Sequence, residues 1–389
     1  MTKKWSSRLT FFAFVVLMVG LGSNDSLRGI FSTIFQEHFS LTTTQLGLIV
    51  TASYIGNLVF LLVGGNLSTR FSKKRVLQML ILIWMAALAL FAFTSNYTVL
   101  LIGMALALGS STLLNTTMNL ITPLLFATAP GFFVNFLFFT QEIGTSGSQY
   151  ILGSHADGFA FWQHTNLVLL ILGAVAFVLL LFCNVPEEAA DPADTPAQKG
   201  GYDWRIIVPY VLVFGFYFIA EHGVMNWMVA YGVDGLGLPQ ASAAKYLSVF
   251  FGGMMIGRLC LSPLVDKLGA LKSLAAFGGV SCVLYLIGSL GGAVTMPVWA
   301  ISGLSFSILY PTLVMSIRLY FPAQQVSGAA GTILSIASLA DILFNVGFGK
   351  LVDMAGYAVS IRVLPLSVLT FFIVFMLFTK FCKPTQKLK

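Results

Sequence analysis

The 389-residue sequence has few charged residues. Asp, Glu, Lys and Arg together make up 9% of the chain, whereas apolar residues make up 57%. A soluble domain usually carries about 25% charged residues, because water must solvate its surface. The shortage of charge therefore excludes an ordinary soluble protein and predicts that most of the surface faces lipid.

Cysteine is scarce and scattered. The four cysteines, Cys183, Cys260, Cys282 and Cys382, have the spacing of neither a disulfide framework nor a metal site. The sequence also lacks a phosphate-binding loop and a nucleophile–base pair. We therefore expect a protein that is not an enzyme and that holds no metal or other cofactor.

The net charge of +7 does not come from a basic patch. Most lysines and arginines lie in short segments between apolar runs, and a cytoplasmic N-terminus would place most of the 21 on the cytoplasmic side. This distribution follows the positive-inside rule. We expect an integral protein of a bacterial cytoplasmic membrane, with both termini in the cytoplasm and no nucleic-acid partner.

Apolar runs of about 20 residues, the length of a membrane-crossing helix, recur along the chain. The predicted spans are 9–30, 44–66, 75–94, 98–122, 131–153, 166–184, 205–231, 241–265, 271–291, 295–319, 325–349 and 360–381. A polar segment rich in proline and acidic residues separates the sixth span from the seventh. We predict an all-α membrane protein with a six-helix bundle at 1–184, a cytoplasmic linker at 185–204 and a second six-helix bundle at 205–389.

The two predicted bundles share an internal repeat at an offset of 197 residues. Gly56 aligns with Gly253, and Arg75 aligns with Lys272. Both copies follow the second span of their bundle, as a parallel duplication of six helices requires. Chance similarity between two apolar segments is the alternative interpretation.

The repeated loops resemble the signature of the major facilitator superfamily. The matching positions are Gly65, Arg70, Lys74 and Arg75 in the first copy and Asp266, Lys267, Gly269 and Lys272 in the second. Thr69 stands where the family has an aspartate in the first copy. The resemblance implies twelve helices in two pseudo-symmetric bundles, a monomeric transporter working by alternating access, and a conformational latch formed by Arg70, Arg75, Asp266 and Lys267.

Shorter stretches resemble the fucose/glucose/galactose–proton symporter family. They are Asn24–Asp25 in the first span, Asn115-x3-Asn119 in the fourth, Gln141 in the fifth and EHGVMNW (221–227) in the seventh. Asn115 stands where that family often has glutamate. The resemblance implies proton-coupled uptake of a sugar or a similar small polar solute. A proton-coupled exporter of drugs or metabolites in the same fold is the alternative.

Ionisable side chains inside a span are costly in lipid, so each one calls for a role. Asp25 and Arg28 lie one helical turn apart. They predict a carboxylate that takes up and releases a proton beside a balancing charge, with a static ion pair as the alternative. Glu221 and Asp341 are further proton-coupling candidates, whereas Glu142 has no assigned role.

Amide and carboxylate side chains suited to sugar hydroxyls gather in the first, fourth, fifth and seventh spans. The predicted substrate-binding residues are Asn24, Asn115, Asn119, Gln141, Glu221, Asn226 and Trp227. Trp227 is expected to cover the C–H face of a sugar ring. The alternative is helix–helix packing for the residues of the seventh span, and contact with protein for the polar stripe of the fourth. A membrane sensor or scaffold without transport is a third class, and intramembrane carboxylates in both halves argue against it.

Overall fold

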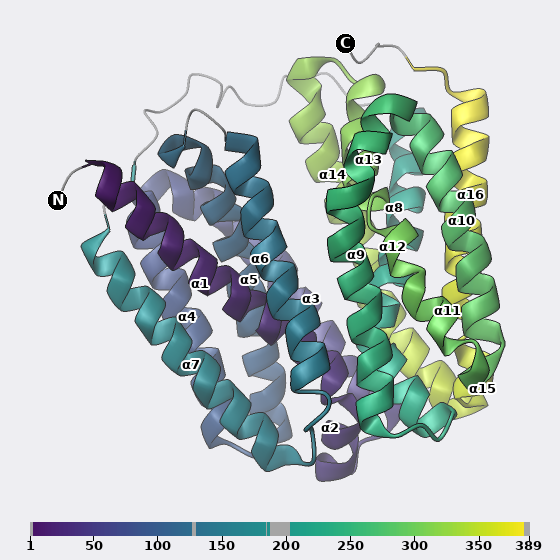
Figure 1. Ribbon diagram of the computed structural model, residues 1–389, viewed down its shortest axis with the longest axis horizontal. Helices are drawn as coiled ribbons and strands as arrows, with labels where there is room; N and C mark the ends of the chain where they lie inside the picture. The colour runs from purple at the N-terminus through teal and green to yellow at the C-terminus, as the bar shows by residue number, and fades with distance from the viewer. Residues whose placement is uncertain (1–2, 127–129, 184, 187–202, 385–389) are drawn as a thin grey trace. The chain divides into compact units, whose positions relative to one another are not determined.

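The computed structural model describes residues 3–126, 130–183, 185–186 and 203–384, with the side chains of 3–6, 64–70, 120, 123, 130–132, 135, 262, 266, 323–324 and 327 left aside. Every regular element of these residues is a helix (Figure 1). The chain divides into two compact units, Met1–Asp191 and Pro192–Lys389. The predicted linker at 185–204 lies mostly outside the described residues.

The described residues of the first unit form seven helices. They are α1 (Lys3–Ile30), α2 (Ser32–Phe39), α3 (Thr43–Arg70), α4 (Lys73–Phe93), α5 (Tyr97–Leu125), α6 (Pro130–Ile151) and α7 (Phe159–Phe182). Within this unit α1 packs on α6 and α7, while α5 packs on α3 and α4.

The described residues of the second unit form twelve helical elements of different lengths. They are α8 (Trp204–Ala230), η1 (Tyr231–Gly235), α9 (Gln240–Leu268), α10 (Ala270–Leu290), η2 (Gly292–Val294), α11 (Met296–Ile301), α12 (Gly303–Phe306), α13 (Leu309–Ser316), η3 (Ile317–Leu319), α14 (Ala323–Ala355), α15 (Tyr357–Ser360) and α16 (Val363–Phe381). Within it α8 packs on α14 and α16, and α9 packs on α11 and α12.

Eleven helical segments of the described residues are long and apolar enough to cross a membrane. The remaining long helix, α6, has 22 residues, and at 1.5 Å per residue it is about 33 Å long. These segments coincide with the predicted spans and confirm an all-α membrane protein.

The outer face of α7 is as apolar as its inner face. Its exposed positions include Val168, Ile171, Val175, Val178 and Phe182, and its buried ones include Leu169, Gly173, Ala176 and Leu180. A helix at a water-exposed surface would carry polar residues on the outer face. The outer face of α7 is therefore suited to contact with acyl chains.

Several helices begin at capping residues that are visible in the sequence. Thr42 and Gln45 form a capping box ahead of α3, with the Thr42 N–H donating to Gln45 Oε1 at 2.9 Å and the Gln45 N–H donating to Thr42 Oγ1 at 3.2 Å. Asn96 Oδ1 accepts from the Thr98 and Val99 N–H groups at the start of α5. Such caps satisfy the N–H groups that have no partner inside the helix.

Two elements differ from the predicted spans. The short helix α2 was not predicted, and α7 begins at Phe159 instead of residue 166. From the sequence, the segment 159–166 is predicted to be a loop because it contains the polar residues Gln163, His164 and Asn166. In the structure Trp162 and Asn166 are buried, so packing within the unit extends the helix through this polar stretch.

The predicted span 295–319 is a chain of short helices. The break between α12 and α13 falls at Ser307 and Ile308. Pro311 has no N–H, so it cannot form the helical hydrogen bond to the carbonyl of Ser307. The Ser307 hydroxyl donates to the Leu304 carbonyl at 2.7 Å. Proline and serine together therefore explain the interruption.

Glycines allow close helix crossings at matching places in the two units. A Cβ at Gly56 on α3 would lie 2.0 Å from the Ala105 carbonyl oxygen on α5. A Cβ at Gly253 on α9 would lie 3.0 Å from the Leu304 nitrogen on α12. In each unit the second span thus meets the fourth at a glycine. This equivalence supports the internal repeat.

The α1–α6 crossing also depends on glycine. A Cβ at Gly144 on α6 would lie 2.1 Å from the Val19 carbonyl oxygen on α1, whereas a Cβ at Gly147 on α6 would have no atom within 4 Å. We expect Gly144→Ala to lower the stability of the protein by about 1–3 kcal/mol, because the backbones must separate. Gly147→Ala is the matched control, and it should leave stability unchanged or slightly raised because alanine favours helix. Thermal unfolding of the purified variants in detergent checks this, and equal effects would contradict the close crossing.

Candidate functional site

In the first unit, Asp25 on α1 is a half-satisfied carboxylate. The Ser111 hydroxyl on α5 donates to Asp25 Oδ2 at 3.2 Å. The other oxygen, Oδ1, is buried and has no hydrogen-bond partner among the described residues. Buried carboxylate oxygens are normally paired, because leaving one unpaired costs free energy. Asp25 is therefore placed to bind a further proton or donor group.

Arg28 lies one turn after Asp25 on α1 and is buried. Its guanidinium carbon lies 5.7 Å from the centre of the Tyr54 ring on α3, a cation–π contact. Its positive charge acts on the Asp25 carboxylate. The arginine thus offsets the charge of Asp25 while packing against an aromatic ring.

Three amide side chains form a hydrogen-bonded chain, which we call the amide chain. Asn119 Nδ2 donates to Asn115 Oδ1 at 2.6 Å, and Asn115 Nδ2 donates to Gln141 Oε1 at 2.6 Å. The amide chain joins α5 to α6. Asn119 Oδ1 is buried and has no hydrogen-bond partner among the described residues. The amide chain therefore has an acceptor open at one end.

Asn24 and Glu142 stand apart from the amide chain. The Trp84 indole N–H on α4 donates to Asn24 Oδ1 at 3.3 Å, and both residues are buried. Asn24 thus links α1 to α4 through this hydrogen bond. Glu142 lies half-buried on α6.

In the second unit, Glu221 on α8 lies within electrostatic reach of three tyrosines. We call Tyr217, Tyr285 and Tyr310 the tyrosine cluster; the Glu221 charge acts on all three hydroxyls. The Tyr217 ring stacks on Phe306 with centroids 5.0 Å apart and on Tyr310 with centroids 6.0 Å apart. Glu221 therefore sits beside aromatic faces contributed by other helices.

Three features make the tyrosine cluster suitable for a polar ligand. The Tyr217 hydroxyl is buried and lies next to the Glu221 carboxylate. Arg258 on α9 acts on Tyr217 and Tyr310 with its positive charge. Tyr310 is only half-buried. In the sequence, the signal that could have found this cluster is Tyr217, one turn before Glu221; the tyrosines on other helices give no such signal.

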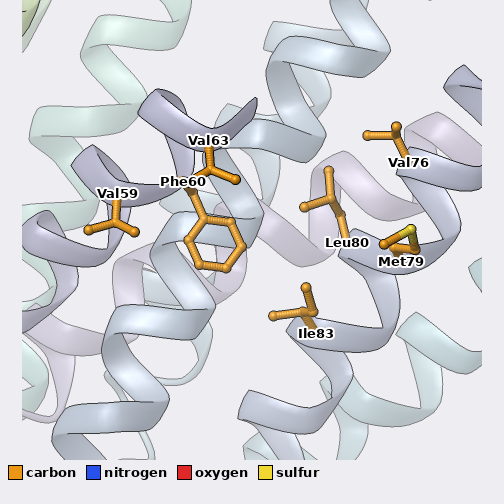
Figure 2. A pocket seen from close by; sticks show the side chains of 7 residues that line it. All are labelled: Val59, Phe60, Val63, Val76, Met79, Leu80 and Ile83. Atoms are coloured by element: carbon orange, nitrogen blue, oxygen red, sulfur yellow. The ribbon is translucent and has the colours of Figure 1, made fainter. Parts of the chain in front are cut away.

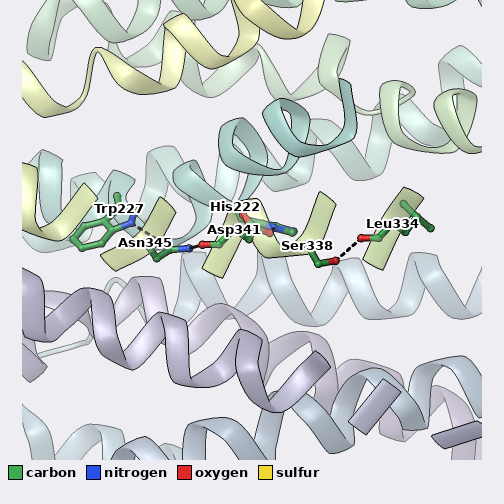
Figure 3. Close-up of polar contacts among 6 residues, drawn as sticks. All are labelled: His222, Trp227, Leu334, Ser338, Asp341 and Asn345. Atoms are coloured by element: carbon green, nitrogen blue, oxygen red, sulfur yellow. Dashed lines mark hydrogen bonds and ion pairs between the residues drawn. The ribbon is translucent and has the colours of Figure 1, made fainter. Parts of the chain in front are cut away.

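Asp341 on α14 contacts His222 on α8 (Figure 3). The contact joins His222 Nδ1 to Asp341 Oδ2. A second link runs parallel to it: the Trp227 indole N–H donates to Asn345 Oδ1 at 2.9 Å, and Asn345 Nδ2 donates to the Asp341 main-chain carbonyl at 2.8 Å. The two links hold α8 against α14. Sequence analysis identified Asp341 as a candidate without finding its partner.

Trp227 is completely buried, and its ring packs 4.8 Å from Phe348. Asn226 is also buried. In this conformation the chain covers the Trp227 face that was expected to meet a sugar ring, and its N–H is occupied by Asn345. The structure therefore gives Trp227 a packing role.

The predicted latch residues are only partly described. The side chains of Arg70 and Asp266 lie outside the described residues, while Arg75 and Lys267 are exposed. Lys74 has a local role: its ammonium donates to the carbonyl oxygens of Leu181 at 3.0 Å and Cys183 at 2.7 Å. It thereby ties the start of α4 to the end of α7.

One pocket of the first unit lies between α3 and α4 and is entirely apolar (Figure 2). Its lining residues are Val59, Phe60, Val63, Val76, Met79, Leu80 and Ile83. No side chain among these donates or accepts a hydrogen bond, so the pocket suits an acyl chain and not a sugar. Among the described residues, no group of three or more His, Cys, Asp or Glu side chains could hold a metal ion.

Comparison with known proteins places the chain in a family. Residues 10–340 match the model of the Major Facilitator Superfamily. The chain belongs to this superfamily. Members of this superfamily are transporters. This protein, which we call the facilitator, is an integral membrane protein with the fold that its loop signature indicated.

Relatives of this facilitator transport sugars or an organic acid. It is 24% identical to the L-fucose-proton symporter of Escherichia coli over 333 residues, covering 74% of this chain and 75% of the symporter. It is 26% identical to the glucose/galactose transporter of Brucella abortus over 341 residues, covering 82% and 81%. It is 24% identical to the cis,cis-muconate transport protein of Acinetobacter baylyi over 297 residues, covering 71% and 70%.

Solved structures share the fold. The D-xylose-proton symporter superimposes with a TM-score of 0.78 at 16% identity, covering 99% of both chains. The transporter FucP in its outward conformation superimposes with a TM-score of 0.65 at 20% identity, covering 96% of this chain and 99% of FucP. At these identities the likeness concerns the fold.

The packing role of Trp227 is testable. Trp227→Phe removes the indole N–H and leaves Asn345 Oδ1 buried without its donor, which costs about 1–3 kcal/mol. We expect a lower unfolding temperature in detergent, whereas Trp204→Phe, at a position 58% exposed, should match wild type. Trp227→Phe with wild-type stability and abolished sugar binding would restore the solute-stacking role.

Proposed function

We propose that this facilitator is a secondary active transporter that couples proton flow to the uptake of a hexose or a similar small polar solute. The observation that carries the proposal is the amide chain. Three amides in membrane-spanning helices are joined end to end, with a buried acceptor at Asn119 left without a partner among the described residues. An unpaired buried acceptor costs about 1–3 kcal/mol, which a solute hydroxyl would recover on binding.

In the second unit we assign hydroxyl recognition to Glu221 and ring contact to the tyrosine cluster. A carboxylate accepts hydrogen bonds from sugar hydroxyls, and an aromatic face covers the apolar C–H side of a sugar. Tyr310 replaces Trp227 as the proposed ring contact, because Tyr310 is half-buried whereas Trp227 is fully covered. Asn226 remains a proposed substrate-binding residue beside them.

The relatives favour the same solute class, since one is an L-fucose-proton symporter and another a glucose/galactose transporter. We propose Asp25 as the proton-coupling carboxylate of the first unit, with Arg28 offsetting its charge. Protonation would give the unpaired Asp25 oxygen a hydrogen to donate, and deprotonation would leave the Ser111 hydroxyl and Arg28 to stabilise the anion. We also propose that the protein is a monomer and that both of its termini lie in the cytoplasm. The proposed conformational latch consists of Arg70, Arg75, Asp266 and Lys267.

The prediction for substrate binding concerns Glu221. Glu221→Gln keeps the shape and removes the negative acceptor, so a hydrogen bond worth about 1.5–3 kcal/mol is weakened. We expect the Kd for the best-bound sugar to rise by about ten- to a hundredfold. The measurement is equilibrium binding of L-fucose, D-galactose and D-glucose to purified protein, with Glu37→Gln at an exposed position as the matched control.

The same assay decides the solute class. Binding of a sugar to wild type with unchanged affinity in Glu221→Gln would move the site away from the tyrosine cluster. Absence of sugar binding, together with tight binding of a lipophilic cation or aromatic drug, would favour the exporter alternative.

A further inference from the structure

The contact between His222 and Asp341 joins a partly accessible base to a buried acid. The His222 side chain is 25% exposed and the Asp341 side chain 3% exposed. We propose that these two residues form a second proton-binding site, in which the imidazole takes up the proton and the carboxylate holds its charge. The proposal rests on the proposed function in one respect, that protons drive transport.

The geometry fixes the ring in place. His222 Nδ1 meets Asp341 Oδ2, and the imidazole stacks on Phe218 with centroids 5.5 Å apart and planes 9° apart. The neighbouring Trp227–Asn345 link holds the register of α8 and α14 at this level (Figure 3). The imidazole is therefore oriented by a carboxylate on one ring nitrogen, as in acid–base pairs that move protons.

Charge balance explains why the pair suits this task. Without the extra proton, a neutral imidazole donates Nδ1–H to an ionised Asp341, and the pair carries one negative charge. With the proton on the other ring nitrogen, an imidazolium faces a carboxylate, and the pair is neutral. In lipid a neutral pair is far less costly than an isolated charge. Proton loading therefore changes the electrostatic cost of burying the pair.

The carboxylate also contains an unused acceptor. Asp341 Oδ1 is buried and has no hydrogen-bond partner among the described residues. A carboxylate in contact with a histidine stabilises positive charge on that histidine. The charge of each side chain should therefore depend on the charge of the other.

Other ionisable groups lie on the helices that pack against the pair. The described ones on the elements packed against it are Arg205, Tyr210, Tyr217 and Glu221 on α8, Tyr231 and Asp234 on η1, Lys245, Tyr246, Arg258, Cys260 and Lys267 on α9, Arg318 on η3, Lys350 and Asp353 on α14, Tyr357 on α15 and Lys380 on α16. Glu221 precedes His222 by one residue, so it projects about 100° away around α8, toward the tyrosine cluster. Lys350 lies nine residues from Asp341, about 14 Å in helical rise. Asp234 lies twelve residues from His222, about 18 Å in helical rise.

The first test needs no solute. The chain has four histidines, so the wild-type protein labelled with nitrogen-15 histidine in detergent gives few ring signals, and His222→Gln identifies the signal of His222. We expect this signal to titrate between about pH 5 and 8, the range where histidine ordinarily changes charge. In Asp341→Asn the midpoint should move by about one pH unit or more, because the imidazolium loses its counter-charge.

The second test connects the pair to transport. In proteoliposomes, His222→Gln should still exchange L-fucose, D-galactose or D-glucose, whichever binds, but should move fewer protons per sugar than wild type. His155→Gln, at an exposed position outside the spans, is the matched control and should behave as wild type.

The outcomes separate the two proposals. A His222 signal that does not titrate in this range, or that is unaffected by Asp341→Asn, overturns the pair as a proton site. Unchanged proton movement per sugar in His222→Gln also overturns it. Normal titration in a protein that binds none of the three sugars supports the proton site and instead contradicts the proposed solute class.

Discussion

Lipid offers no hydrogen bonds, and this constraint governs the structure of the facilitator. Helices satisfy the backbone internally, and hydroxyl side chains in the spans donate back to carbonyls of the preceding turn, as Thr117 does to Leu113 and Ser338 to Leu334. Amides and carboxylates have no such local solution, so they need partners on neighbouring helices. Where a buried oxygen still lacks a partner among the described residues, as at Asp25, Asn119 and Asp341, a proton or a solute is the natural occupant.

Hydropathy was sufficient to find the spans because the signal is local. Runs of about 20 apolar residues correspond to helices wherever they occur, and capping pairs such as Thr42 and Gln45 mark their starts. The break in the tenth span was less visible, since it depends on the combination of Pro311 with serines that bond to nearby carbonyls. The extension of α7 to Phe159 depends on burial of Trp162 and Asn166, which no local pattern expresses.

The candidate site shows the same difference between local sequence signals and long-range packing. Sequence spacing identified the amides of the fourth and fifth spans, and the structure joins Asn115 to both Asn119 and Gln141. Spacing could not pair residues separated by more than a hundred positions. His222 with Asp341, and Trp227 with Asn345, meet only because α8 packs on α14. Likewise the sequence contains no sign that Asn24 on α1 bonds to Trp84 on α4.

The two units carry different chemistry on a shared plan. Each brings its second span against its fourth at a glycine, which supports duplication of one bundle. The first unit contains the amide chain beside Asp25, whereas the second contains Glu221, the tyrosine cluster and the His222–Asp341 pair. We propose that amides and aromatic rings recognise the solute, whereas separate carboxylates bind the protons.

The most direct test of proton-coupled uptake is the pH inside proteoliposomes after external sugar is added without an imposed gradient. With L-fucose, D-galactose or D-glucose, whichever binds, wild type should acidify the interior as sugar and protons enter together. Asp25→Asn should reduce the acidification by half or more while sugar exchange continues. Sugar entry into wild-type vesicles with no change in internal pH, or equal acidification in Asp25→Asn, would contradict this account.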